Sequence, residues 1–240
     1  MKDITMLNKP PLDFFGCNFC LVEKHRMAFV LISKCGLTFL ENIAIYASAG
    51  MIPDTEDQTH FYIARVKPER FLVPVSEMSG YEREHKSYLK VAVWRDPVER
   101  LVSAYKYFIL ERTFNQYMYM CNLYQDCSFE RFLSFVEFEL GKANPLWQDE
   151  HIRRQSDFYT SADVDCIVPL SKLNRFLAER GVDMPEEKAN ATSVRFELKD
   201  EKQIAKIKEL YRLHTSQVAL LFSQTPYRIH LGRCLPVTEI

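Results

Sequence analysis

The chain has 240 residues, enough for one domain with a sizeable hydrophobic core. Its 31 basic and 32 acidic residues give a formal net charge of −1, so no overall field favours nucleic acid or an anionic membrane. Glycine is scarce, at seven residues, and no G-x-G-x-x-G segment occurs, which argues against a glycine-rich dinucleotide site. Any anion-binding site must therefore be local.

The first clear element is a strand followed by a helix. Residues 1–26 have no clear period and are expected to be irregular. Residues 27–32 form a continuous apolar run, which is typical of a strand buried on both faces. Apolar residues then recur at helical spacing from Leu37 to Ala47, and Gly50 follows as a C-terminal stop. This pattern predicts a turn at 33–36 whose following helix offers N–H groups to a phosphate-like anion.

A second strand, turn and helix follow. Leu89–Trp94 is expected to be another buried strand, with Asp96 as the N-cap and Pro97 as the first residue of the next helix. Arg95 then stands at the carboxyl end of that strand, where ligands of open α/β sheets bind, and its planar fork suits a phosphate. Two such turns in one sheet suit a ligand with two separated anionic groups.

The remaining segments complete the pattern. Residues 51–70 and 113–127 are mixed and predict no clear element. Further elements are expected as a short strand at 71–75 that Pro74 places at an edge, a helix from Ser128 to Leu140, a strand at Asp165–Pro169, a helix from Ser171 to near Gly181 and a helix at Asp200–Ser223. Strands that alternate with helices predict an α/β fold, a single domain with a mainly parallel central sheet flanked by helices.

The cysteines and hydropathy point to an intracellular setting. Seven cysteines lack paired metal-ligand spacing, so we expect reduced, mostly buried thiols and no metal. No apolar run approaches about 18 residues, and the N-terminus lacks a signal-peptide pattern. The chain is therefore expected to be cytoplasmic, with no transmembrane segment and no nucleic-acid partner.

Three segments resemble those of sulfotransferases. Residues 33–38, Ser-Lys-Cys-Gly-Leu-Thr, resemble the 5′-phosphosulfate loop, and residues 95–105 resemble the 3′-phosphate motif of carbohydrate-type (family 2) members. Residues 149–155 are similar to the family's His-Trp-Arg-Pro-Gln-type segment, with Ile152 in place of Trp and Arg154 in place of Pro. The resemblance implies a P-loop-like nucleotide-binding fold in a soluble bacterial member. Within the single domain 1–240, residues 27–110 would be the nucleotide-binding core and 113–160 an acceptor-side insertion.

The resemblance also implies the co-substrate 3′-phosphoadenosine 5′-phosphosulfate (PAPS). Lys34 is expected to contact the 5′-phosphate and the oxygen that bridges it to the sulfonate, where charge develops as the S–O bond breaks. Arg95 and Ser103 are expected to hold the 3′-phosphate. The donor-binding residues expected in full are Lys34, Cys35, Gly36, Leu37, Thr38, Phe39, Arg95 and Ser103.

The acceptor hydroxyl must lose a proton, so a histidine or glutamate is expected near Lys34. Candidates between the two anion motifs are His60, Glu69, Glu77 and His85, and the third motif adds His151. We retain His60, Glu77 and His151 as candidate catalytic bases, with His60 first.

The family favours a carbohydrate or glycolipid as the acceptor. The Tyr- and Met-rich residues 117–124 would suit the apolar face of a sugar, but also a sterol or other lipid alcohol. An alternative of another class is a non-catalytic nucleotide-binding module that has kept the pocket.

Overall fold

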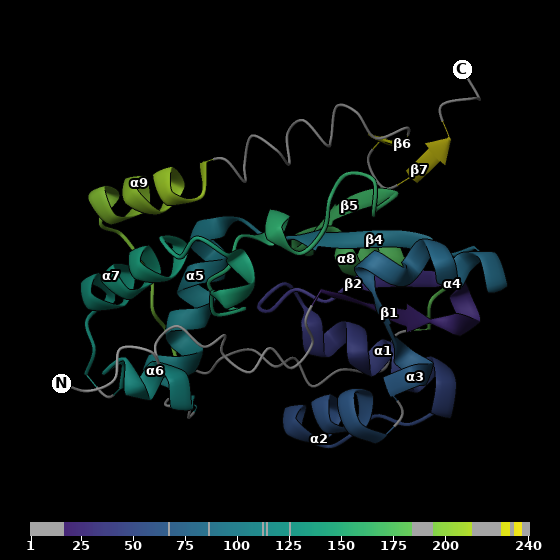
Figure 1. The fold of residues 1–240 in the computed structure, drawn as a ribbon, viewed down its shortest axis with the longest axis horizontal. Helices are drawn as coiled ribbons and strands as arrows, with labels where there is room; N and C mark the ends of the chain where they lie inside the picture. The colour runs from purple at the N-terminus through teal and green to yellow at the C-terminus, as the bar shows by residue number, and fades with distance from the viewer. Residues whose placement is uncertain are drawn as a thin grey trace. The chain divides into compact units, whose positions relative to one another are not determined.

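The computed structural model (Figure 1) describes residues 17–66, 68–85, 87–111, 113, 115–124, 126–183 and 194–212, and the backbone of 227–230 and 233–236. These residues form two compact units. The sheet unit takes its described residues from 17–95, from 158–183 and from the two short C-terminal ranges; the helical unit takes its described residues from 96–157 and 194–212. The prediction that the chain is one functional domain stays a prediction.

The strands are β1 (Asn18–Val22), β2 (Met27–Val30), β3 (Leu72–Pro74), β4 (Leu89–Trp94), β5 (Cys166–Pro169), β6 (Tyr227–His230) and β7 (Arg233–Pro236). The α-helices are α1 (Leu37–Ala49), α2 (Glu56–Phe61), α3 (Pro68–Phe71), α4 (Met78–Glu84), α5 (Pro97–Tyr105), α6 (Gln116–Met120), α7 (Phe129–Leu140), α8 (Leu173–Ala178) and α9 (Glu201–Leu210).

The sheet unit contains one five-stranded sheet in the order β3-β1-β2-β4-β5, and β6 and β7 pair separately. The β2–β4 and β4–β5 pairings are parallel, whereas β1 runs antiparallel to both β2 and β3. The predicted α/β class is therefore confirmed, and the parallel arrangement holds for two of these four pairings. The parallel half includes β2 and β4, the strands that lead into the two anion motifs.

The antiparallel half was not foreseen. Residues 18–22, expected to be irregular, form β1. Arg26 adopts a left-handed conformation (φ 52°), which reverses the chain so that β2 pairs antiparallel with β1. The run is short and buried nearly throughout, so it carries neither the length nor the alternation that identifies a strand. Pro74 of β3 lies at the sheet edge, as predicted.

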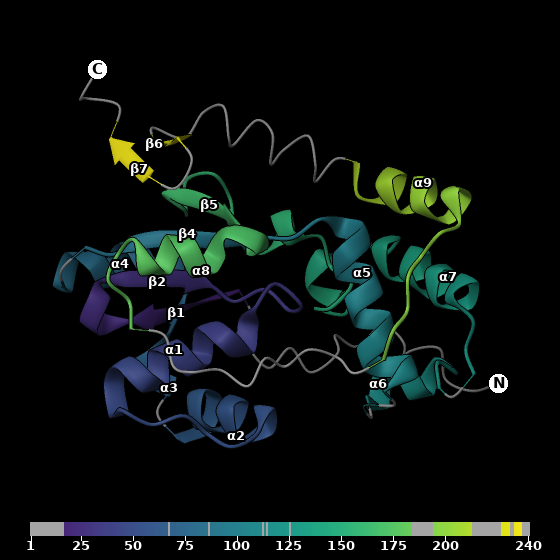
Figure 2. The ribbon, with the colours of Figure 1, turned by 180° about the vertical axis from the view of Figure 1, so that it is seen from behind.

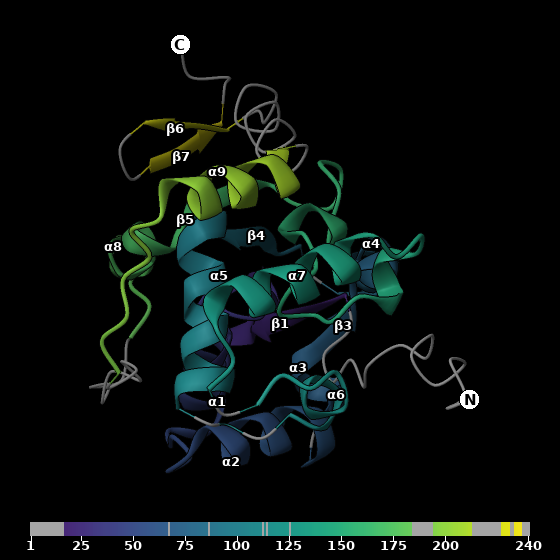
Figure 3. The ribbon, with the colours of Figure 1, turned by 90° about the vertical axis from the view of Figure 1, so that its left-hand side faces the viewer.

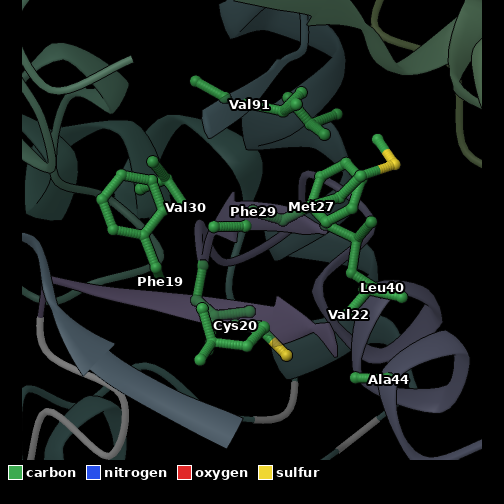
Figure 4. Close-up of a cluster of buried hydrophobic side chains, with 14 of the residues drawn as sticks. Phe19, Cys20, Val22, Met27, Phe29, Val30, Leu40, Ala44 and Val91 are labelled. Atoms are coloured by element: carbon green, nitrogen blue, oxygen red, sulfur yellow. The ribbon is translucent and has the colours of Figure 1, made fainter. Parts of the chain in front are cut away.

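Helices cover both faces of this sheet. In Figure 1 α4 lies in front of the sheet, and in the reverse view of Figure 2 α8 lies in front of β2 and β4. Figure 4 shows the core where Leu40 and Ala44 of α1 meet the strands. The strand side chains labelled there are Phe19, Cys20 and Val22 of β1, Met27, Phe29 and Val30 of β2, and Val91 of β4. This packing fixes α1, whose first turn follows the first anion motif.

Three predicted helices have the expected ends. Gly50 ends α1 in a left-handed conformation with its N–H donating to the Tyr46 carbonyl. Asp96 caps α5 by accepting from two backbone N–H groups, and Ser128 caps α7 by accepting from the Arg131 N–H.

Other boundaries differ. Residues 51–70 contain α2, a π-helical turn at Tyr62–Val66 and the start of α3. Ser171 lies inside a 3₁₀ turn (Leu170–Lys172), so α8 begins later, at Leu173, and ends at Ala178. The predicted helix at 200–223 is confirmed only as α9, because residues 213–223 lie outside the described residues, as do 1–16 of the N-terminal segment.

The helical unit has its own core. Within this unit, α9 packs across α5 and α7 (Figure 3). Ile207 and Tyr211 of the α9 region are buried in the same hydrophobic cluster as Phe132 of α7. In the described part of the chain, no helix is both long and apolar enough to cross a membrane.

Candidate functional site

The turn at 33–36 redirects the chain from β2 into α1. Lys34 and Gly36 both adopt left-handed conformations, with φ of 64° and 82°. Glycine takes this conformation without strain, and a Cβ at Gly36 would come within 3.0 Å of the Leu170 side chain. The turn is therefore packed closely against the segment that follows β5.

Among the described residues, no side chain caps the N-terminus of α1. Gly36 is the N-cap residue, and its carbonyl accepts the first helical bond from Leu40. The N–H groups of Leu37, Thr38 and Phe39 precede that bond and so have no carbonyl partner within the helix. Backbone N–H groups in this position attract an anion. The predicted strand, turn and helix are confirmed, and the anion itself stays a prediction.

The parallel pairing of β2 with β4 brings Arg95 next to the first anion motif, within the sheet unit. The guanidinium Nη1 of Arg95, just after β4, donates to the carbonyl oxygen of Lys34 at 3.0 Å. Arg95 therefore supports the left-handed turn directly, in addition to any ligand it holds.

A chain of polar contacts runs from the first turn of α1 to α2. Thr38 Oγ1 donates to Glu56 Oε1 at 3.0 Å, and the same carboxylate oxygen lies 3.3 Å from His60 Nε2. His60 Nδ1 lies 2.6 Å from Glu41 Oε2, and the Glu41 side chain is fully buried. We call Thr38, Glu41, Glu56 and His60 the loop network.

The charges of this network shift one another's pKa values. The hydrogen bond from His60, helped by the nearby Lys34, lowers the pKa of Glu56 to about 2. Burial lowers the pKa of His60, but the two carboxylates outweigh burial and raise this pKa to about 9. Burial raises the pKa of Glu41, and the hydrogen bond to His60 only partly opposes it. At neutral pH, His60 is therefore an imidazolium beside an ionised Glu56.

Glu77 and the other carboxylate and histidine candidates of this unit lie elsewhere. Glu77 is exposed at the end of a 3₁₀ turn (Val75–Glu77), and Glu69 is exposed in α3. His85 follows α4 and stacks on the Tyr81 ring. Of the candidate bases, only His60 enters the described loop network.

The third motif lies in the helical unit. His151 Nδ1 lies 3.0 Å from Asp149 Oδ1, and the ring packs edge-on against Phe108. The buried Arg100 donates to the carbonyls of Glu150 and Arg153, at 2.9 and 2.8 Å. Arg100 thus holds this segment through two of its backbone carbonyls.

Ser103, half-buried on α5, also belongs to the helical unit. Its pairing with Arg95 at a 3′-phosphate, and a catalytic role for His151, stay predictions.

The segment 117–124 is partly internal. It forms α6 and the turn after it; Met118 is buried, and the Tyr117 hydroxyl donates to Glu139 at 2.6 Å. Tyr119 and Tyr124 are exposed, with ring centroids 5.5 Å apart. An acceptor wall at this segment stays a prediction.

Glu41 and Glu56 were missed from the sequence, although each leaves a signal. Glu41 follows Leu37 by four residues and so falls on the apolar face of α1, where a charged side chain is unusual. Glu56 precedes His60 by four residues, the spacing at which helical side chains meet.

The family can now be stated. Residues 18–171 match the model of the sulfotransferase family, which is more than half of the chain, so the chain belongs to this family. Membership makes it a transferase of sulfonate groups, and the matched span includes the loop at 33–38, Arg95, Ser103 and the third motif. No curated protein and no solved structure matches the chain.

Proposed function

We propose that this protein transfers the sulfonate of PAPS to an acceptor hydroxyl. The observation that carries the proposal is the turn at 33–36, where Lys34 precedes the N-terminus of a 13-residue helix that no described side chain caps. This geometry suits a phosphate ester, because backbone N–H groups and a lysine ammonium meet the same anion.

Transfer is an in-line displacement. The acceptor oxygen attacks sulfur as the bond from sulfur to the 5′-phosphate oxygen breaks, and the leaving phosphate gains the electron pair. Lys34 stabilises that developing charge more in the transition state than in the ground state. Arg95 and Ser103 hold the 3′-phosphate in this proposal.

The charges of the loop network bear on which group takes the acceptor's proton. His60 is already protonated at neutral pH, because its pKa is raised to about 9 between two carboxylates. Glu56 is ionised, and it accepts from Thr38 in the loop at 33–38, which we call the donor loop. The charge of the nearby Lys34 helps to lower the pKa of Glu56. A carboxylate whose pKa is lowered to about 2 is a weak base, so in this proposal Glu56 orients the donor loop through Thr38 and does not take the proton. Separate substitutions of His60, Glu77 and His151 test which of these three candidates accepts it.

The acceptor class is a carbohydrate or glycolipid hydroxyl. The exposed Tyr119, Met120 and Tyr124 supply the aromatic and thioether surface that would bind a sugar's apolar face. The same surface would suit a sterol or other lipid alcohol.

Radiolabelled PAPS incubated with a panel of oligosaccharides, glycolipids and sterols tests the proposal. Label should move to one acceptor class with the wild type and not with Lys34→Ala. Binding of 3′-phosphoadenosine 5′-phosphate (PAP) without any transfer would instead indicate the non-catalytic module.

A further inference from the structure

Glu41 is a carboxylate in a place where a carboxylate is costly. Its side chain is fully buried in the sheet unit, where it interacts electrostatically with Cys20 of β1. Its Oε2 faces His60 Nδ1 at 2.6 Å, and its Oε1 is buried with no hydrogen-bond partner among the described residues. An isolated buried charge of this kind destabilises a fold unless a partner compensates it.

The contacts of Glu41 lead back to the donor loop. His60 connects Glu41 to Glu56, and Glu56 accepts from Thr38, which lies one helical turn before Glu41 on α1. The three contacts therefore close a ring that fastens α2 to the first turn of α1. A neutral contact lies beside it, where Thr59 Oγ1 donates to Asn42 Oδ1 at 2.9 Å.

We propose that Glu41 is a positioning residue for sulfonate transfer. Glu41 holds His60 so that both ring N–H groups donate, one to each carboxylate. His60 in turn fixes the Glu56 carboxylate beside the donor loop. The inference rests on the proposed function. Glu41 itself touches neither donor nor acceptor in this account. Its contribution is the contact from Oε2 to His60 Nδ1, which keeps the ring protonated and oriented.

The surrounding charges are consistent with this role. The ionisable groups that face Glu41 and His60 are Cys20 from β1 and Glu56 from α2, while Lys34 from the turn acts on Glu56. Burial, and then Glu41, raise the pKa of Cys20, so this thiol stays neutral. The two carboxylates flanking His60 are therefore what hold its pKa near 9.

Glu41→Gln tests the inference, because glutamine keeps the shape and an acceptor oxygen but removes the charge. The pKa of His60 should fall, so the ring should lose its proton at a lower pH than in the wild type. Wild-type kcat should hold as pH rises towards about 9 and then fall, whereas the alkaline limb of Glu41→Gln should move at least about one pH unit lower. At neutral pH, kcat should drop about 10–100-fold with PAP affinity unchanged.

Thr59→Val is the matched control, since it removes the neighbouring contact between α1 and α2 without changing any charge. Its pH–rate profile should superimpose on that of the wild type. If Glu41→Gln also superimposes, the positioning role is refuted while the proposed function stands. Absence of transfer by the wild type with every acceptor would refute the proposed function, and the positioning role with it.

Histidine NMR keeps the inference testable if Glu41→Gln folds poorly. In the wild type, both ring nitrogens of His60 should stay protonated up to about pH 9. An ordinary titration near about pH 6.5 would overturn the inference.

Discussion

At the residue scale, Lys34 combines a strained backbone with a charged side chain. A non-glycine residue in the left-handed region costs about 1 kcal/mol, and the bond from Arg95 to the Lys34 carbonyl offsets part of that cost. Lys34 stands shortly before the N-terminus of α1, where its ammonium can reach the same anion as the backbone N–H groups of the helix.

Lys34→Ala should separate chemistry from binding. We expect kcat to fall by about 10²-fold or more, with the PAP dissociation constant rising much less, because the lysine charge matters most as the bond to sulfur breaks. Single-turnover kinetics and calorimetry with PAP provide the two measurements. Near-wild-type turnover at saturating donor would make the loop a binding element only.

Two buried tyrosines offer a test of hydroxyl pairing. The Tyr159 hydroxyl has no hydrogen-bond partner among the described residues, and burial raises its pKa, whereas the Tyr211 hydroxyl donates to the Ile152 carbonyl at 2.6 Å. Tyr159→Phe should leave the free energy of unfolding unchanged or raise it by up to about 1 kcal/mol, and Tyr211→Phe should lower it by about 1 kcal/mol. Urea unfolding measures both, and equal losses in the two variants would contradict this difference.

At the scale of elements, the sequence predicted those helices whose ends carry capping chemistry. α1, α5 and α7 were predicted with their stop or cap residues, because Gly50, Asp96 and Ser128 act locally on the backbone. The six-residue α2 was missed, since it is too short to show a helical period.

That omission explains why the site was only partly predicted. The turn at 33–36 and the position of Arg95 directly after β4 could be predicted from strand–turn–helix patterns, which are local. The loop network could not, because Glu41 and His60 meet only when α2 packs against α1. The role of His60 as a base stays a prediction, and the two carboxylates that raise its pKa to about 9 were not foreseen.

Arg100 should be essential to the helical unit. Its guanidinium is almost wholly buried and donates to two carbonyls of the 149–155 segment, so Arg100→Leu leaves those acceptors buried and unpaired. We expect the free energy of unfolding to fall by about 2 kcal/mol or more. Arg131→Ala, at an exposed position of α7, serves as the control and should change it by less than about 0.5 kcal/mol. Comparable chemical-denaturation midpoints for the two variants would contradict this stabilising role of Arg100.

At the scale of the whole molecule, stability should depend on pH through His60. Its pKa is raised to about 9 from an ordinary value near 6.5, so the protonated ring favours the folded state. This stabilisation is complete below about pH 6.5 and is lost as pH rises through about 9. The difference in unfolding free energy between the wild type and His60→Gln should therefore be largest near about pH 6 and shrink towards pH 9. A difference that does not vary with pH would show that His60 is neutral in the folded protein.

The family match extends over both units, from residue 18 to residue 171, and so includes every motif that the sequence predicted for the donor. The general activity follows from the family. The identity of the donor depends on a finer prediction, that Arg95 and Ser103 recognise a 3′-phosphate, the group that distinguishes PAPS from AMP and ATP.

Calorimetric binding of PAP, AMP and ATP to the wild type tests that central claim most directly. A charge-assisted contact to the 3′-phosphate contributes about 1.5–3 kcal/mol, so PAP should bind at least about tenfold more tightly than AMP, and also more tightly than ATP. The preference for PAP should disappear in Arg95→Leu. Equal affinity of the wild type for PAP and AMP would contradict the proposed donor.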